Sequence, residues 1–182
     1  MVILETERLI LRELTEEDIP LLTPIMSDGE TMQYYPMTFD APYIRKWLAN
    51  SMGSYRKNGF GRWGVIIKET GTFIGDAGIT YHMLDGEELP ELGYRLCRAY
   101  WRQGYGSEAA RAIRDWAFRN TELPAIYSFM MTANIASAAT AESCGMRLYK
   151  HYMDEINGDT FLYTLTREEW ERLFAGGDAP SA

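Results

Sequence analysis

Cysteine and histidine are scarce in this chain of 182 residues. The two cysteines, Cys97 and Cys144, are too few to form a disulfide framework. The two histidines, His82 and His151, lie far apart without the spacing of metal ligands, so we expect no structural or catalytic metal. Free cysteines are usually small buried hydrophobes, and no histidine lies near Cys97 in sequence, which disfavours cysteine catalysis.

Positive charge is also in short supply. The 18 Lys and Arg residues stand against 26 Asp and Glu residues, a formal net charge of −8. Proteins that bind nucleic acid rely on clustered Lys and Arg, so we expect no nucleic-acid partner, whereas a cationic substrate would be attracted. No stretch approaches about eighteen consecutive apolar residues, and no basic segment at the start leads into an apolar run. We therefore expect a cytoplasmic protein with no membrane partner.

The composition that remains is that of an ordinary globular protein. Hydrophobic residues make up 46% of the chain and charged residues 24%, and 182 residues suit one domain with a full core. We find no internal repeat and no linker. The sequence predicts a single domain over residues 1–174 and a disordered tail over residues 175–182.

Hydrophobic periodicity predicts a mixed α+β sheet flanked by helices. Strands are predicted at residues 8–14, 63–67, 72–83, 91–96, 125–131, 147–153 and 160–166, and helices at residues 15–27, 40–58, 104–119, 134–144 and 167–174. The order up to the last strand is β-α-α-β-β-β-α-β-α-β-β. Residues 84–90 are predicted to form an acidic loop that carries Asp85, Glu87 and Glu88 and collects cationic acceptors.

A pair of glycines opens the helix at 104–119, which has the clearest apolar stripe of the chain. The first backbone N–H groups of a helix have no partner within the helix, and residues without a Cβ let an anion approach them. Gly104 and Gly106 therefore predict an anion-binding loop. A nucleotide triphosphate loop would need a Lys after the glycines, and none follows.

A dinucleotide site is the closer alternative. Gly104-x-Gly106-x-x-Ala109 fits the dinucleotide fingerprint locally. That fingerprint belongs to a first βαβ unit with an acidic residue at the end of the next strand, and the next strand here ends in Thr132-Ala133-Asn134. A nucleotide-linked oxidoreductase is therefore disfavoured. The glycines would otherwise mark only a tight helix-to-strand contact.

The element order and these motifs together resemble the GNAT superfamily of acyl-CoA-dependent N-acetyltransferases, over roughly residues 4 to 174. In that family a Q/R-x-x-G-x-G/A loop binds the CoA pyrophosphate, and this chain fits it with Trp101 at the first position. The branch that resembles ribosomal-protein-alanine acetyltransferases shares that Trp. It also shares the stretches Glu7-Arg8-Leu9-Ile10-Leu11-Arg12, Glu91-Leu92-Gly93-Tyr94 and Gly104-Tyr105-Gly106-Ser107-Glu108-Ala109.

The resemblance implies acetyl-CoA as co-substrate and a mainly antiparallel sheet in which strands four and five, residues 91–96 and 125–131, splay apart around pantetheine. An N–H near Leu96 would stabilise the oxyanion formed from the thioester. The implied CoA-binding residues are Leu96, Cys97, Arg102, Gln103, Gly104, Tyr105, Gly106, Ser107, Asn134 and Ser137. Helix capping is the structural alternative for Asn134 and Ser137.

The proton donor and the base are less closely tied to the motifs. Many relatives have a Tyr seven residues after the Asn, where this chain has Ala141, and Ser137 is a substitute donor. Glu91 is our first candidate for the base, with a surface ion pair to Arg95 or Arg62 as its structural alternative. The weaker candidates are Glu30, Asp76 and Tyr81. Tyr34, Tyr35 and Tyr81 are predicted to line the acceptor cleft, unless they belong to the core.

The sequence thus predicts an acetyl-CoA-dependent N-acetyltransferase that acts on a protein N-terminal α-amine or a small-molecule amine by direct attack in a ternary complex. The alternative is an acyl-CoA sensor without efficient turnover, which Ala141 keeps open. A homodimer also stays open.

Overall fold

The computed structural model describes residues 1–174, so the predicted disordered tail, residues 175–182, lies outside the described residues. The strands are β1 (Val2–Glu5), β2 (Leu9–Glu13), β3 (Arg62–Ile67), β4 (Phe73–Leu84), β5 (Glu87–Leu96), β6 (Ala125–Met131), β7 (Arg147–Asp154) and β8 (Gly158–Thr166). The helices are α1 (Ile19–Met26), α2 (Ala41–Asn58), α3 (Tyr105–Asn120), α4 (Ile135–Ser143) and α5 (Arg167–Phe174). No helix among these described residues is long and apolar enough to cross a membrane.

The strands of the described residues form one mixed sheet in the order β1-β2-β3-β4-β5-β6-β8-β7. Neighbouring strands are antiparallel except β5 and β6, which are parallel. This confirms the predicted fold class and element order, with β1 as an unpredicted addition. Val2–Glu5 is a short edge strand whose ends are exposed, so its sequence shows no clear alternation.

The sheet opens between β5 and β6. These two described strands pair at one position, Glu91 opposite Tyr127. On its other edge β5 pairs with β4 along its whole length, from Glu87 opposite Leu84 to Leu96 opposite Gly75. The predicted splay of the fourth and fifth strands is therefore present. We call this opening the β5/β6 fork.

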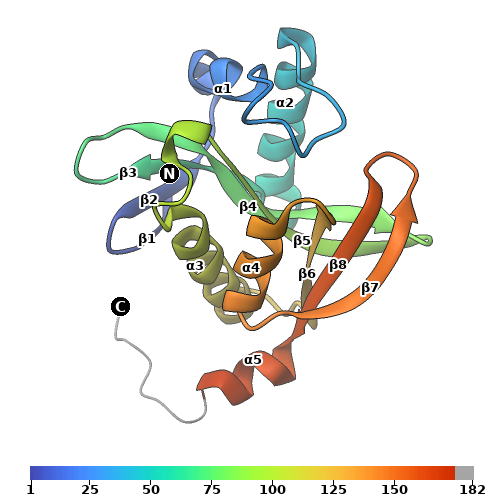
Figure 1. Cartoon of the computed structure of the whole chain (residues 1–182). Coiled ribbons are helices and arrows are strands. Elements are labelled where there is room, and N and C mark those ends of the chain that lie inside the picture. The colour runs from blue at the N-terminus through green and yellow to red at the C-terminus, as the bar shows by residue number, and fades with distance from the viewer. Residues whose placement is uncertain (175–182) are drawn as a thin grey trace.

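Helices cover both faces of the sheet. In Figure 1, α1 and α2 lie on one face and α3 and α4 on the other. The larger core lies between the sheet and α3, where Ala109, Ile113 and Ala117 of the predicted stripe are buried. A smaller core joins α1, α2 and the sheet through Leu14, Leu22, Met26, Ile44 and Leu48. Burying an Ile or Leu side chain contributes about 1.5–3 kcal/mol, so these two cores fix the helices against the sheet.

Three predicted helix starts have the expected caps. The Asp40 side chain accepts a hydrogen bond from the Tyr43 N–H at 2.9 Å and begins α2. Thr15 forms a capping box with Asp18 at a short 3-10 turn that precedes α1. Before α5, the Glu169 carboxylate accepts from the Thr166 N–H at 2.9 Å, and the Thr166 hydroxyl accepts from the Glu169 N–H.

The predicted acidic loop at residues 84–90 is wrong. The strands continue to a tight turn at Asp85 and Gly86, which both have positive φ, and Glu87 and Glu88 belong to β5. Asp-Gly is a preferred two-residue hairpin turn, so the two strands need no longer connection. Asp85 also forms an ion pair with Lys150 at 2.7 Å, which leaves no loose acidic loop to collect a substrate.

Candidate active site

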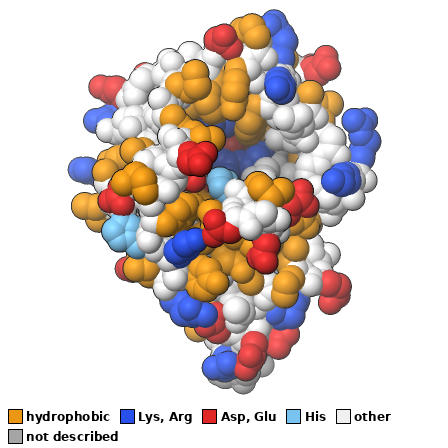
Figure 2. Space-filling view, turned by 90° about the vertical axis from the view of Figure 1, so that its right-hand side faces the viewer, with side chains coloured by type: hydrophobic (Ala, Val, Ile, Leu, Met, Phe, Trp, Pro, Cys, Tyr) orange, Lys and Arg blue, Asp and Glu red, His pale blue; other side chains and the backbone are white. Residues whose placement is uncertain are grey.

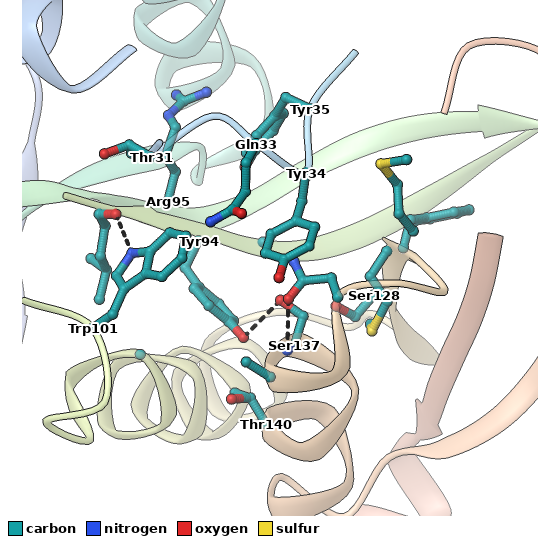
Figure 3. A pocket seen from close by; sticks show the side chains of 18 of the residues that line it. Thr31, Gln33, Tyr34, Tyr35, Tyr94, Arg95, Trp101, Ser128, Ser137 and Thr140 are labelled. Carbon is teal, nitrogen blue, oxygen red and sulfur yellow. Dashed lines mark hydrogen bonds between the residues drawn. The ribbon is translucent and has the colours of Figure 1, made fainter. Parts of the chain in front are cut away.

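A cavity of about 890 Å³ runs along the β5/β6 fork. Its walls come from the segment before α2, from β4 and β5, from the start of α3, and from β6 and α4 (Figure 3). This volume lies within the usual range for small-molecule sites. The fork thus gives one continuous space that reaches both faces of the sheet.

The start of α3 forms one end of the cavity. Gly104 is the N-cap residue with φ of 83°, a left-handed conformation that favours glycine, and its helix has no side-chain cap. The N–H groups of the first turn are therefore available to an anion, as predicted. Five of the six predicted loop residues line the cavity: Arg102, Gly104, Tyr105, Gly106 and Ser107. Gln103 does not line it.

Arg8, which the sequence analysis placed only in a motif, braces this loop. Its guanidinium contacts the Glu108 carboxylate at 2.6 Å, donates to the Gln103 carbonyl at 2.9 Å and lies over the Tyr105 ring at 4.5 Å. Partial burial opposes ionisation of Glu108, but hydrogen bonds from Thr6 and Arg8 lower its pKa. The first strands thereby hold the loop in place.

Trp101, at the position where relatives have Gln or Arg, closes the loop from the other side. Its indole N–H donates to the Leu96 carbonyl at 2.7 Å (Figure 3). Leu96 lines the cavity, as predicted, but Cys97 does not. The Cys97 N–H already donates to the Ile74 carbonyl, and the Cys97 carbonyl accepts from the Tyr100 N–H. The backbone of Cys97 is therefore engaged within the protein.

Helix α4 supplies the facing wall. Both Asn134 and Ser137 line the cavity. The Asn134 side chain also caps α4 by accepting from the Ser137 N–H at 3.2 Å, so the structural alternative for Asn134 is present as well. Ala141, where many relatives have a Tyr, is buried and absent from the cavity wall.

Tyr94 is a site residue that the sequence analysis missed. Its hydroxyl donates to the Ser137 hydroxyl at 3.2 Å (Figure 3). Burial raises the pKa of Tyr94, so its phenol stays protonated. A Cβ added at Gly106 would lie 3.3 Å from the Tyr94 ring, so the small residue in the loop leaves room for this phenol. The signal in the sequence was the alternation of β5, which puts Tyr94 on the α3 face.

The other face of β5 carries an arginine pair. Arg95 points away from Tyr94 and Ser137 in Figure 3. Arg62 and Arg95 both line the cavity, and both contact Asp76, whose Oδ1 accepts from Arg62 Nε at 2.8 Å and whose Oδ2 accepts from Arg95 Nε at 3.0 Å. Asp76 is fully buried between them, so it cannot serve as the base. Burial opposes the charge of Arg62, but Asp76 raises its pKa.

Glu91 lies in the cavity wall beside His82. Its carboxylate is 3.6 Å from His82 Nδ1, and the imidazole stacks on Phe129 with ring centroids 4.0 Å apart. The nearby Glu91 carboxylate raises the pKa of His82, although partial burial opposes this. The predicted alternatives of an ion pair with Arg95 or Arg62 do not form, since both arginines pair with Asp76. His82 was missed because strand alternation does not show which residue of the next strand lies diagonally opposite.

The predicted acceptor residues do not all meet. Tyr34 and Tyr35 line the cavity. Tyr81 is 40% exposed, packs against Phe60 and lies outside the cavity wall. Glu30, a weaker candidate for the base, has a 72% exposed side chain that pairs with Arg98. Among residues 1–174, no group of three or more His, Cys, Asp or Glu side chains could hold a metal ion.

Comparison with known proteins yields consistent matches. The family model described as "Acetyltransferase (GNAT) domain" matches residues 8–147. FsC-acetyl coenzyme A-N(2)-transacetylase of Aspergillus fumigatus is 30% identical over 190 aligned residues, which cover 93% of this chain and 78% of that protein.

Solved structures agree. The crystal structure of an acetyltransferase from Agrobacterium tumefaciens superimposes with a TM-score of 0.77 at 32% identity, covering 89% of this chain and 92% of that one. The ribosomal-protein-S5-alanine acetyltransferase of Vibrio fischeri has a TM-score of 0.75 at 18% identity, covering 92% and 97% of the two chains, and therefore shows a shared fold alone.

Proposed function

The chain belongs to the GNAT acetyltransferase family, whose members carry out acetyl-CoA-dependent N-acetylation, and on this premise we propose that it moves the acetyl group to a primary amine by direct attack in a ternary complex. The acceptor is the α-amine of a protein N-terminus or a small-molecule amine. The observation that carries the proposal is the single cavity that joins the uncapped start of α3 to Glu91 through the β5/β6 fork. Residues 1–174 form the acetyltransferase domain.

The co-substrate side of the proposal uses the α3 end of the cavity. The pyrophosphate is bound by the loop residues Arg102, Gly104, Tyr105, Gly106 and Ser107, and pantetheine lies in the fork beside Leu96, Asn134 and Ser137. Gln103 and Cys97 have no place in this proposal because neither lines the cavity. Gln103 acts instead through its carbonyl, which accepts from Arg8.

The reaction needs a base at the other end. The amine nitrogen must lose a proton as it attacks the thioester carbon and the C–S bond breaks. A Lys side chain has a pKa of about 10.4, so deprotonating it at pH 7 costs roughly 4.6 kcal/mol, whereas the α-amine of a polypeptide N-terminus, with a pKa near 8, costs about 1 kcal/mol. Glu91 is the proposed base, because it lies in the cavity wall and Asp76 is engaged. His82 beside it positions the carboxylate.

The departing thiolate takes its proton at the α4 wall. Tyr94 and Ser137 are hydrogen-bonded to each other there and both line the cavity. We propose that Tyr94 supplies the proton, directly or through the Ser137 hydroxyl, in the role that a Tyr at the Ala141 position has in many relatives. A thiol with a pKa near 8.5 is a tolerable leaving group, so this assistance is modest.

A binding protein that senses acyl-CoA without turnover is the second candidate, and Ala141 is the observation that favours it. Release of free CoA thiol from acetyl-CoA in the presence of amines separates the two functions. Turnover requires thiol release that rises with amine concentration and yields N-acetylated product. A sensor binds acetyl-CoA and releases no thiol.

Two glycine variants test the co-substrate end. Gly106→Asp puts a negative charge against the pyrophosphate, so we expect acetyl-CoA affinity to fall at least tenfold, about 1.4 kcal/mol. Gly53→Asp is the matched control, since Gly53 is also a helix glycine and a Cβ added there meets nothing within 4 Å. Equal acetyl-CoA affinity in wild type and a folded Gly106→Asp protein would remove the α3 loop from the proposal.

A further inference from the structure

At the acceptor end of the cavity, the floor is the face of the sheet formed by β3, β4 and β5, and it carries two arginines. Figure 2 looks into a hollow in which Arg or Lys side chains lie deep, with acidic and His side chains near its rim. The cavity-lining residues on this face of the sheet include Arg62, His82, Glu91, Gly93 and Arg95. They come from β3, β4 and β5, whose pairing puts Arg62 opposite Gly78 and Gly78 opposite Gly93. The two glycines leave the guanidinium of Arg62 uncovered by side chains of the floor.

The arginines have hydrogen-bonding capacity left over. Asp76 accepts hydrogen bonds from Nε of Arg62 at 2.8 Å and from Nε of Arg95 at 3.0 Å, and the Nη2 atoms of the two arginines lie 2.7 and 2.8 Å from its oxygens as ion-pair contacts. Both Asp76 oxygens are thereby engaged by the two guanidinium groups, while Nη2 of Arg95 is buried without a hydrogen-bond partner among the described residues. Nη1 of Arg62 has no hydrogen-bond partner within residues 1–174, although Arg62 is only 7% exposed. This nitrogen is not among the buried unpaired atoms of the described residues, so it is open to the cavity, and a ligand there that carries a negative charge can supply its acceptor.

Arg95 keeps this arrangement rigid. Its guanidinium carbon lies 5.4, 5.4 and 5.0 Å from the ring centroids of Tyr35, Phe39 and Trp47. These rings hold Arg95 against Asp76, and Asp76 in turn fixes the orientation of the Arg62 guanidinium. The donor that faces the cavity is therefore already oriented before any ligand arrives.

Glu91 lies next to that donor without pairing with it. A Cβ added at Gly93 would overlap Arg62 Nη1 and would come within 3.4 Å of Glu91 Oε1, so both atoms border the same point of the cavity floor. The ion pair that Glu91 forms is with His82, not with Arg62. A carboxylate and a guanidinium N–H thus stand side by side around a space that a glycine leaves open.

We propose that the amine acceptor is an α-amino acid with a free carboxylate, whose amine faces Glu91 and whose carboxylate binds Nη1 of Arg62. This rests on the proposed N-acetyltransferase function and narrows its acceptor. The amine and the carboxylate of an α-amino acid are attached to the same carbon atom. This suits Glu91 and Arg62 Nη1, which border the same point of the cavity. Tyr34 and Phe129, which also line the cavity, offer an apolar surface to the amino-acid side chain.

Other amine classes fit the floor less well. The first residue of a protein N-terminus has an amide where a free amino acid has its carboxylate, so Arg62 would gain only a neutral acceptor. A polyamine would bring further positive charge against Arg62 and Arg95. A zwitterion carries no net charge, so the chain's overall −8 neither attracts nor repels it over long range.

The test compares amino acids with their own amides. L-Phenylalanine, L-leucine and L-methionine are each paired with phenylalaninamide, leucinamide and methioninamide, and CoA thiol release from acetyl-CoA is followed at equal concentrations of free amine. We expect the acid of at least one pair to exceed its amide at least tenfold in kcat/KM, about 1.4 kcal/mol. Amides that react as well as or better than the acids in every pair would overturn the inference while leaving N-acetyltransfer intact.

Two variants assign the preference to Arg62. Arg62→Lys keeps a positive charge but loses the planar guanidinium group. The ratio of kcat/KM for the acid to that for the amide should therefore fall to about threefold or less, while acetyl-CoA affinity is unchanged. Arg56→Lys, on the exposed surface of α2, should keep the wild-type ratio. An unchanged ratio in a folded Arg62→Lys protein overturns the assignment, and if that variant does not fold, the wild-type pairs still decide. Absence of thiol release with every acid and amide contradicts the proposed turnover itself.

Discussion

Glu91 combines two roles at one residue. Its backbone forms the single rung between β5 and β6, and its side chain faces His82 and the acceptor end of the cavity. The rung fixes the backbone of the proposed base at the point where the fork opens. A carboxylate so placed is close to an amine that approaches the fork from the α2 face.

Glu91→Gln should therefore lose activity in a pH-dependent way. At pH 7 most of an α-amine is protonated, so removing the base should lower kcat/KM by about 10²-fold or more, in the usual range for general base catalysis. Near pH 9 the free amine is abundant and most of the deficit should disappear. The measurement is kcat/KM for wild type and variant from pH 6.5 to 9.5. A deficit that stays constant over this range would mean that Glu91 positions the substrate instead of deprotonating it.

The hydroxyl pair at the α4 wall can be divided by two variants. Ser137→Ala should raise the KM for acetyl-CoA while kcat stays within about threefold, since the proposed donor Tyr94 remains and can protonate the thiolate directly. Tyr94→Phe should lower kcat by about tenfold with acetyl-CoA affinity nearly unchanged. Steady-state kinetics with saturating amine, together with acetyl-CoA titrations, report both quantities. A 10²-fold loss of kcat in Ser137→Ala with intact binding would make Ser137 the proton donor.

The site residues that the sequence could predict are those with a local backbone signature. Gly104 and Gly106 predict an anion-binding helix N-terminus, and Asn134 predicts a helix N-cap. Tyr94, His82 and Arg62 carry no such signature, because their roles come from the register of β3, β4 and β5. A shift of one residue in that register would put each on the opposite face, and sequence periodicity does not fix register between strands.

Among the elements, α5 depends most visibly on one carboxylate. Arg147 and the Thr166 N–H hold the pKa of Glu169 at about 2. A folded-state pKa below the ordinary value of about 4.3 means that the stabilisation is present above pH 4.3 and is lost as pH falls through about 2.

Glu169→Ala should accordingly lower the free energy of unfolding by about 1 kcal/mol at pH 7, the usual cost of losing a helix cap. The difference from wild type should shrink by more than half at pH 3. Urea denaturation at the two pH values measures it. Glu168→Ala, in the same turn but 79% exposed, serves as the control and should stay within about 0.5 kcal/mol of wild type. A difference for Glu169→Ala that is equal at both pH values would exclude the carboxylate charge as its source.

Most elements were predictable because their apolar spacing and their caps agree, as in α2, which has Asp40 before it and Gly59 after it. The elements that the sequence analysis missed are one short strand and one tight turn. β1 is an exposed four-residue edge, and the Asp85-Gly86 turn was hidden by the acidic residues that follow it. No element was predicted at residues 2–5 and a loop was predicted at residues 84–90, and in both places pairing with a neighbouring strand decided the outcome.

At the scale of the whole molecule, the fork leaves the sheet in two parts, β1 to β5 and β6 to β8, joined at one rung and by the helices. A ligand that fills the fork adds contacts to both parts. Binding of such a ligand should therefore raise the free energy of unfolding of the whole protein.

Acetyl-CoA at 100 times its Kd should raise the free energy of unfolding by about 2.7 kcal/mol and the Tm by roughly 5–10 °C. Thermal unfolding followed by circular dichroism, with and without acetyl-CoA, measures the shift. Gly106→Asp should need at least tenfold more acetyl-CoA for the same shift, and Gly53→Asp should behave as wild type. No shift at millimolar acetyl-CoA would contradict binding in the fork.

The Glu91–Tyr127 pair, where β5 and β6 meet, is a fixed point about which the two strands can separate. If β5 and β6 move further apart to admit a bulkier acyl chain, this pair stays where it is, and so does the proposed base. Chain length and proton transfer are then separate properties of this enzyme. Propionyl-CoA and butyryl-CoA should change KM and the maximal rate, yet leave the midpoints of the pH–rate profile where acetyl-CoA puts them.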